Sequence, residues 1–170
     1  MKKQNGMMLL LAAVAVICLG VAVWALFFRE ETVLAPDQAP PAETQAETIP
    51  GDDTDNKMEK PEGGSSVSLT FAKEVTIDLS EKTADLLFAN PGKSNQDMVL
   101  QIIIQDAVMV QSGTLKPGNQ VTTLTLLDGA AKRLTEGIYE GKFNVLYYDP
   151  VTGAKAVVNT EIPIEITVIK

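Results

Sequence analysis

The sequence predicts an all-β fold, a single β-sandwich preceded by one transmembrane helix and a disordered linker. Three observations lead to this prediction. Residues 7–28 carry no charge, residues 29–66 are rich in proline and acid, and residues 67–170 alternate apolar and polar side chains between turn signals. Seven or eight short strands at such spacing are typical of a β-sandwich.

The first element is the apolar run MMLLLAAVAVICLGVAVWALFF, residues 7–28. As a helix it would be about 33 Å long, enough to cross the hydrocarbon core of a bilayer. Lys2 and Lys3 precede the run and Arg29 follows it together with two glutamates. Because positive charge favours the cytoplasmic side, residues 1–6 are expected in the cytoplasm. The chain after Arg29 is then expected outside the cell membrane.

The aromatic residues of this run are placed at its outer end. Trp24, Phe27 and Phe28 would lie at the outer interface, where amphipathic and aromatic rings are enriched. A cleaved signal peptide is an alternative, because the two lysines also resemble a basic leader. Signal-peptide apolar regions are shorter than this run, however, and the small-residue site ending at Ala35 is followed by Pro36.

The single cysteine of the chain is Cys18, in the middle of the apolar run. The exported part therefore has no disulfide and must be stable on its core alone. A lipoprotein would require small residues before the cysteine, whereas Val16 and Ile17 precede it here. The lipoprotein alternative is accordingly disfavoured.

Residues 29–66 are predicted to be an acidic, proline-rich, disordered linker. They carry a net charge of −7 and very few large apolar side chains, so burial cannot offset the entropy of ordering them. Within this segment, the run GDDTDNKMEK suggests a calcium loop. A calcium loop that begins at Asp53 needs an oxygen ligand at its fifth position and glycine at its sixth. Those positions are Lys57 and Met58, so the match fails. A solvated spacer is the better interpretation, and a fragment beginning near Ser66 is expected to fold alone.

The remaining residues, 67–170, are predicted to be an extracytoplasmic β-sandwich domain. In the run MVLQIIIQ, alternation places Met98 and Leu100 on one face and Gln101 on the other. Residues 128–134, DGAAKRL, are expected to form one short helical turn that crosses between sheets. The strands are expected at residues 67–71, 75–79, 83–89, 98–105, 108–112, 121–127, 143–148 and 162–169.

A tyrosine motif precedes the penultimate strand. Leu134, Gly137 and Tyr139 have the order found in a tyrosine corner, in which a tyrosine near the start of a late strand bonds its hydroxyl to backbone upstream. Leu134 would close the end of the core, Gly137 would allow the tight entry, and Tyr139 would be the latch. Tyr148, at the end of the same strand, is expected to tolerate loss of its hydroxyl.

The chain from Leu87 to Val168 resembles the immunoglobulin-like and fibronectin type III-like domains of membrane-anchored Gram-positive surface proteins. In those domains a leucine and a glycine precede a tyrosine, and the next strand ends in a Tyr-Asp and a Thr-Gly turn, as at 148–149 and 152–153 here. The resemblance implies a Greek-key sandwich of about seven strands. It departs from antibody domains because the cysteine pair and the tryptophan are missing.

Composition excludes several functions. The sequence contains no histidine, which removes histidine-based catalysis and imidazole metal ligands. The net charge is −8 and no basic face is evident, so nucleic acid is not an expected partner. No glycine-rich phosphate loop follows a strand. We therefore expect no enzyme activity, no cofactor, no metal site and no small-molecule substrate.

The sequence thus predicts a single-pass protein of the bacterial cell envelope. Its function is expected to be a membrane-tethered interaction, scaffolding or adhesin-like module whose partner is another envelope or surface protein. The alternative is a minor pilin-like or secretion-complex assembly subunit, suggested by Gly6-Met7 before the apolar run. Leu11 stands where such segments usually carry glutamate, and Pro36 would interrupt the long helix that they need.

Overall fold

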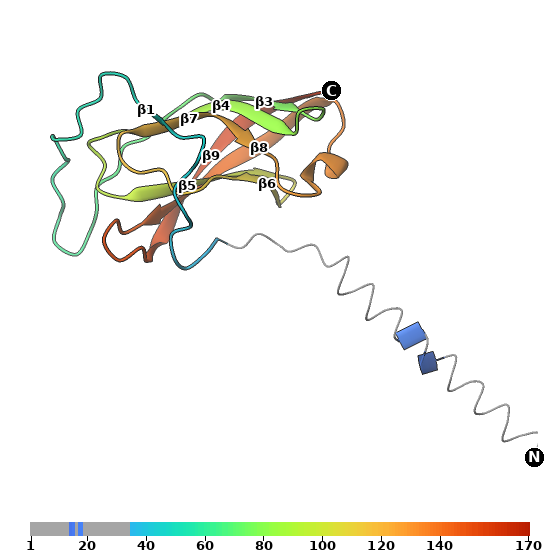
Figure 1. Ribbon diagram of the computed structural model, residues 1–170, viewed down its shortest axis with the longest axis horizontal. Coiled ribbons are helices and arrows are strands. Elements are labelled where there is room, and N and C mark those ends of the chain that lie inside the picture. Colours follow the sequence, from blue (N-terminus) through green and yellow to red (C-terminus); the bar gives the residue numbers. More distant parts are fainter. Residues whose placement is uncertain (1–13, 16, 19–34) are drawn as a thin grey trace, which may run out of the picture. The chain divides into compact units, whose positions relative to one another are not determined.

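The computed structural model describes residues 14–15, 17–18 and 35–170, and the chain divides into two units, Met1–Val33 and Leu34–Lys170 (Figure 1). In the first unit the four described residues are helical. No helix among all these described residues is long and apolar enough to cross a membrane. Of the predicted span at 7–28, only residues 14–15 and 17–18 are among the described residues. The orientation and interface residues lie outside them: Lys2, Lys3, Trp24, Phe27, Phe28 and Arg29.

Residues 35–170 form an all-β domain, which confirms the predicted class. Its elements are β1 (Glu47–Thr48), β2 (Thr70–Phe71), β3 (Glu74–Asp78), β4 (Thr83–Asn90), β5 (Asp97–Ile104), β6 (Ala107–Gln111), β7 (Asn119–Thr125), the 3₁₀ helix η1 (Ala130–Arg133), β8 (Gly137–Tyr148) and β9 (Lys155–Ile169). The strands are hydrogen-bonded in the order β1-β7-β4-β3-β9-β8-β5-β6, and β2 pairs with β4. All pairs are antiparallel except β3 with β9.

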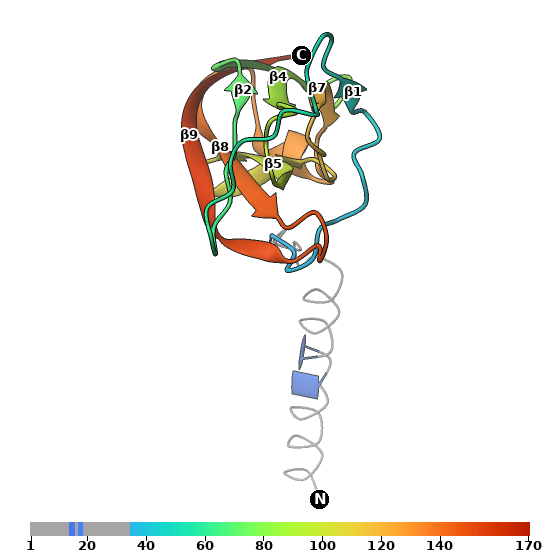
Figure 2. The same ribbon diagram turned by 90° about the vertical axis from the view of Figure 1, so that its left-hand side faces the viewer.

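The sheet curls so that its two halves face each other across one core (Figure 2). Phe88 of β4 meets Phe143 of β8 edge to face, with the ring centroids 5.9 Å apart. The curl is nearly closed, because the backbone N–H of Leu127, just after β7, donates to the carbonyl of Met109 in β6 at 2.9 Å. Apolar side chains from both halves therefore pack into a shared interior, which is the main source of stability in such a domain.

The observed strands follow the predicted alternation, with differences at the edges of the sheet. The strand expected at 67–71 is reduced to the two residues of β2, and β1 lies in a segment where no strand is expected. β8 and β9 are longer than predicted, at 12 and 15 residues. The added residues of β8, 137–142, pair with residues 163–168 of β9, and most of the added residues of β9 pair with residues 144–148 of β8. The added residues are largely exposed, so they lack the alternation that marks a half-buried strand. The helical turn expected at 128–134 is η1.

Residues 35–66, hereafter the strap, contradict the prediction of a disordered linker. The strap is part of the unit Leu34–Lys170 and runs along the domain, where β1 pairs with β7. It is held mainly by hydrogen bonds and by only a little apolar burial. The hydroxyl of Tyr148 donates to the carbonyl of Pro36 at 2.8 Å, and the hydroxyl of Thr114 donates to the carbonyl of Pro40 at 2.5 Å. Proline has no backbone N–H to donate, but its carbonyl still accepts hydrogen bonds. A proline-rich composition therefore does not by itself predict disorder.

Carboxylates of the strap are also used as acceptors. The Gly113 N–H donates to Glu43 Oε2 at 2.6 Å, and the Gly92 N–H donates to Asp52 Oδ2. A side chain at Gly113 would lie 2.7 Å from the carbonyl oxygen of Pro41, so only glycine permits this approach. The acidic residues of the strap, which led to the prediction of disorder, therefore help to hold the strap against the domain.

Candidate functional site

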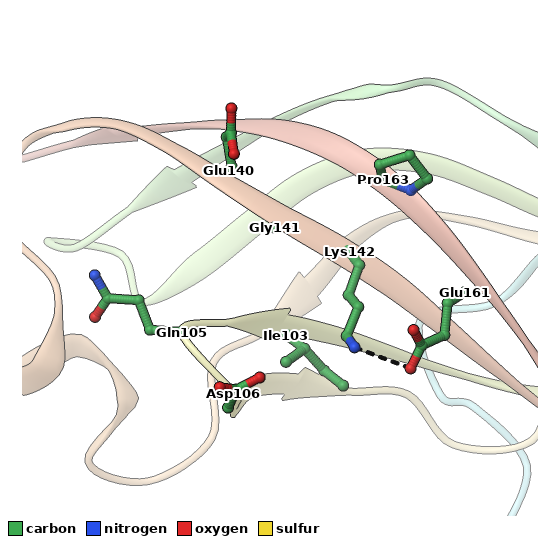
Figure 3. Close-up of a pocket in the computed structure, with 8 residues that line it drawn as sticks. All are labelled: Ile103, Gln105, Asp106, Glu140, Gly141, Lys142, Glu161 and Pro163. Atoms are coloured by element: carbon green, nitrogen blue, oxygen red, sulfur yellow. Dashed lines mark hydrogen bonds and ion pairs between the residues drawn. The ribbon is translucent and has the colours of Figure 1, made fainter.

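An open groove of about 470 Å³ crosses the outer face of the sheet where β5, β8 and β9 lie side by side (Figure 3). The residues that line it are Ile103, Gln105, Asp106, Glu140, Gly141, Lys142, Glu161 and Pro163. One end of the groove is the turn between β5 and β6. Gln105 and Asp106 have φ of 49° and 62° there, as in the two-residue turns that match the twist of a hairpin.

The groove carries both signs of charge with acid in excess. Lys142 Nζ lies 2.9 Å from Glu161 Oε1, and both side chains are partly exposed. An exposed pair of this kind contributes at most about 1 kcal/mol, so its charges remain accessible to a partner. Asp106 and Glu140 add two further carboxylates to the groove. The surface suits hydrogen bonds and ion pairs with a protein that presents basic side chains.

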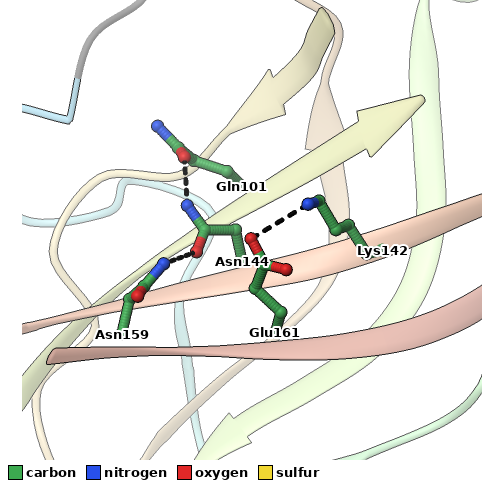
Figure 4. Close-up of polar contacts among 5 residues, drawn as sticks. All are labelled: Gln101, Lys142, Asn144, Asn159 and Glu161. Atoms are coloured by element: carbon green, nitrogen blue, oxygen red, sulfur yellow. Dashed lines mark hydrogen bonds and ion pairs between the residues drawn. The ribbon is translucent and has the colours of Figure 1, made fainter. Parts of the chain in front are cut away.

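A ladder of four side-chain amides crosses the same face beside the groove, and Figure 4 shows three of them, Gln101, Asn144 and Asn159. Gln101 Nε2 donates to Gln111 Oε1 at 2.7 Å, Asn144 Nδ2 donates to Gln101 Oε1 at 2.8 Å, and Asn159 Nδ2 donates to Asn144 Oδ1. Gln101 and Asn144 are buried. Because the amides satisfy one another, the ladder fixes the register of β6, β5, β8 and β9 and leaves little capacity for a ligand.

A small apolar cluster occupies the end of this outer face. Val99, Leu146 and Tyr148 are buried there, separate from the main core. Ala35 and Ala39 of the strap pack against them. This part of the face is therefore already covered, and the groove is the part that remains open.

A second hollow, of about 380 Å³, lies at the end of the domain where loops gather. Lys57 of the strap contributes to it, with residues from the β4–β5, β6–β7 and β8–β9 connections. Asp97 is buried in its wall, and this burial raises the pKa of the Asp97 carboxyl, against the opposing effect of Lys116. Lys57 Nζ donates to the carbonyls of Gly92 at 2.7 Å and Ser94 at 3.1 Å, so that ammonium has a structural role.

The structure brings the predicted corner residues together. The Tyr139 hydroxyl donates to the Thr135 carbonyl at 3.1 Å and accepts from the Thr135 N–H at 3.2 Å. Hydrogen bonds with the hydroxyl and the backbone of Thr135 lower the pKa of Tyr139. Leu134 is buried, and Gly137 has φ of 149°, which side chains rarely adopt. The Tyr139 ring is only partly buried.

Sequence reasoning missed the groove and the ladder. Its only signal was that Gln101 and Asn144 interrupt apolar runs at outward positions of two strands, which pair with each other in the structure. Among the residues that the structure describes, no group of acids and cysteine is arranged to hold a metal ion.

No family model matches this chain, and no curated protein matches it. Among solved structures, AggA, the major subunit of aggregative adherence fimbriae type I from Escherichia coli, is similar with a TM-score of 0.31 and 11% identity, over 66% of this chain and 100% of that chain. The periplasmic chaperone SfaE is similar with a TM-score of 0.33 and 13% identity, over 59% of this chain and 56% of that chain. Both TM-scores are too low for either likeness to bear on the fold or function of this chain.

Proposed function

We propose that this chain is a non-catalytic, membrane-tethered module of the bacterial cell envelope, with an extracytoplasmic immunoglobulin-like domain that binds another envelope or surface protein. In this proposal residues 7–28 are the anchor and the N-terminus is cytoplasmic. The observation that carries the binding role is the open, charged groove over β5, β8 and β9. A shallow surface with a polar rim fits contact with a protein better than enclosure of a small molecule.

The strand order supports the immunoglobulin-like part of the proposal. β7, β4 and β3 form one half of the curled sheet, and β9, β8, β5 and β6 form the other. The chain crosses between the halves three times, from β4 to β5, from β6 to β7 and from β7 to β8, as in Greek-key sandwiches of two antiparallel sheets. Such domains present binding surfaces on a rigid scaffold.

The groove is tested by site-specific photo-crosslinking in intact cells. A photo-crosslinking amino acid at position 105, in the groove, should give a discrete adduct, whereas the same group at position 132, on η1 and outside the groove, should not. Glu140→Lys should weaken the adduct because it reverses a charge of the groove. Glu81→Lys makes the same charge change at an exposed turn and should leave the adduct unchanged. Equal adducts from 105 and 132, or full adduct with Glu140→Lys, would contradict the proposal.

A pilin-like or secretion-complex assembly subunit is the second candidate. Residues 159–162 of β9 pair with β8 on one side and have no strand partner on the other within residues 35–170. An open strand edge of this kind can pair with another chain. Adducts between copies of this chain, in place of adducts with a different protein, would favour this candidate.

A further inference from the structure

The start of the strap is fixed to the hairpin made by β8, the turn at 149–154 and β9. The Ala39 N–H donates to the Gly153 carbonyl at 2.8 Å, and the Tyr148 hydroxyl donates to the Pro36 carbonyl at 2.8 Å. The domain therefore receives its N-terminal connection at this hairpin.

The same hairpin carries the most strongly exposed large apolar side chains of the domain. In residues 35–170, four large apolar side chains are more than two-thirds exposed: Ile138 at 72%, Val151 at 91%, Val157 at 104% and Val158 at 69%. All four are on this hairpin, and three are near its tip: Val151 is in the turn, and Val157 and Val158 are in the first residues of β9. Ile138 is at the opposite end of β8. Single exposed apolar side chains are normal on a protein surface, but a concentration of exposed valines at one hairpin tip indicates contact with an apolar partner.

We propose that the tip of the β8–β9 hairpin contacts the lipid surface of the membrane that holds the chain, with Val151 inserted at the interface. This inference rests on the proposed anchor at residues 7–28. Only the six residues 29–34 separate that anchor from the strap, and fully extended they reach at most about 22 Å. The point where the strap begins, and the hairpin to which it is bonded, therefore cannot move far from the bilayer.

The contact depends on apolar burial and on tethering, and charge does not drive it. The chain has a net charge of −8, and the carboxylates of Asp37 and Asp149 are close to the hairpin. These acidic groups oppose attraction to anionic headgroups, although Lys155 of β9 is on the same hairpin. A short tether holds the hairpin at a high effective concentration near the lipid, so a few valines suffice to populate the contact.

Fluorescence quenching in vesicles tests the inference on the full chain. Cys18→Ser removes the single cysteine, so Val151→Cys can then carry one environment-sensitive fluorophore. Reconstituted in phosphatidylcholine vesicles with brominated acyl chains, the label at 151 should shift to the blue and lose most of its emission. The matched control is Ile138→Cys in the same background, another apolar position, 72% exposed and at the opposite end of β8, whose label should keep its emission.

The outcomes separate the lipid contact from the anchor. Equal emission from labels at 151 and 138, in protein that stays with the vesicles after an alkaline wash, would overturn the lipid contact alone. A blue shift at 151 without quenching by brominated lipid would show a protein surface covering the hairpin and would also overturn it. Loss of the protein from the washed vesicles would overturn the proposed anchor and this inference with it.

Discussion

Tyr148 is fully buried at the end of β8, and its hydroxyl donates to the Pro36 carbonyl at 2.8 Å. Burial raises the pKa of this tyrosine, with a further contribution from Asp37. Tyr139, at the start of the same strand, is partly exposed and bonds to Thr135 four residues upstream. Water can replace the bonds of Tyr139 more easily than the bond of Tyr148. Tyr148, which the sequence predicts to tolerate loss of its hydroxyl, is therefore more constrained than Tyr139.

Removing each hydroxyl should show this difference. Tyr148→Phe should lower the free energy of unfolding by about 0.5–1.5 kcal/mol, because the Pro36 carbonyl loses its donor at a covered site. Tyr139→Phe should lower the melting temperature by less than Tyr148→Phe does. Urea unfolding and thermal melts of the two variants measure this. A larger loss for Tyr139→Phe would show that the corner, and not the strap contact, limits stability.

Asp97 should make stability fall as the pH rises. Burial raises its pKa in the folded state above the ordinary value of about 3.9, so the folded state binds the proton more tightly than the unfolded state. Its contribution to stability is then present at low pH and is lost as the pH rises from about 4 through the folded pKa. Asp97→Asn should remove this decline and leave stability at neutral pH equal or higher, measured by urea midpoints across pH.

Asp149→Asn is the control of opposite sign. Hydrogen bonds from the backbone N–H groups of Thr152 and Val151 lower the pKa of Asp149, so its stabilisation is present at neutral pH and lost as the pH falls. A marked loss of stability in Asp97→Asn at neutral pH would contradict the prediction for Asp97. Attraction to Lys116 would then outweigh the cost of burial.

At the scale of elements, the strap completes the sheet face that β8 and β9 present. Ala35 and Ala39 cover Val99 and Leu146, which would otherwise be an exposed apolar patch on a domain surface. The strap then joins the sheet itself through β1 and β7. It is therefore better described as a domain element than as a spacer.

A fragment that begins at Ser66 should consequently be less stable than one that begins at Ala35. It lacks the strap's hydrogen bonds and exposes the patch under it, so its melting temperature should be lower and it should bind more of an apolar dye. Thr114→Val in the longer fragment removes the bond to Pro40 and should cost about 1 kcal/mol. Thr123→Val removes an exposed bond to Asp85 and should be nearly neutral. Equal melts for the two fragments would show that the strap adds no stability.

The elements that sequence predicts best are those whose pattern is set by the core. Alternation locates β3, β4, β6 and β7 because one face of each is mostly buried, whereas β5 is marked by its apolar run, since nearly all of its residues are buried. The strap escapes prediction because its partners are backbone groups such as the Thr114 amide, far away in sequence. The groove is missed for a related reason, because strand register brings Lys142 of β8 beside Glu161 of β9.

At the scale of the whole molecule, the position of the domain boundary sets the length of the tether. If the domain began at residue 67, then 38 residues of flexible chain, 29–66, would separate it from the proposed anchor. With the strap included, the domain begins near residue 35. Under the proposed anchor, the tether is only the six residues 29–34, and a short tether favours a partner in the same envelope over a distant one.

Trypsin added to intact protoplasts should therefore cut after Arg29 and release a fragment that begins at Glu30. The next site along the chain is Lys57, but the ammonium of that lysine is bonded to Gly92 and Ser94, and the Met58 N–H donates to the Lys93 carbonyl at 2.8 Å. Backbone held in this way must open locally before a protease can cut it. N-terminal sequencing of the released fragment measures the outcome. Arg29→Gln should abolish early release, whereas Lys57→Gln should not change it. A first fragment that begins at Met58 would show that the strap is open in the intact protein, and protection of the whole domain would place it inside the cell.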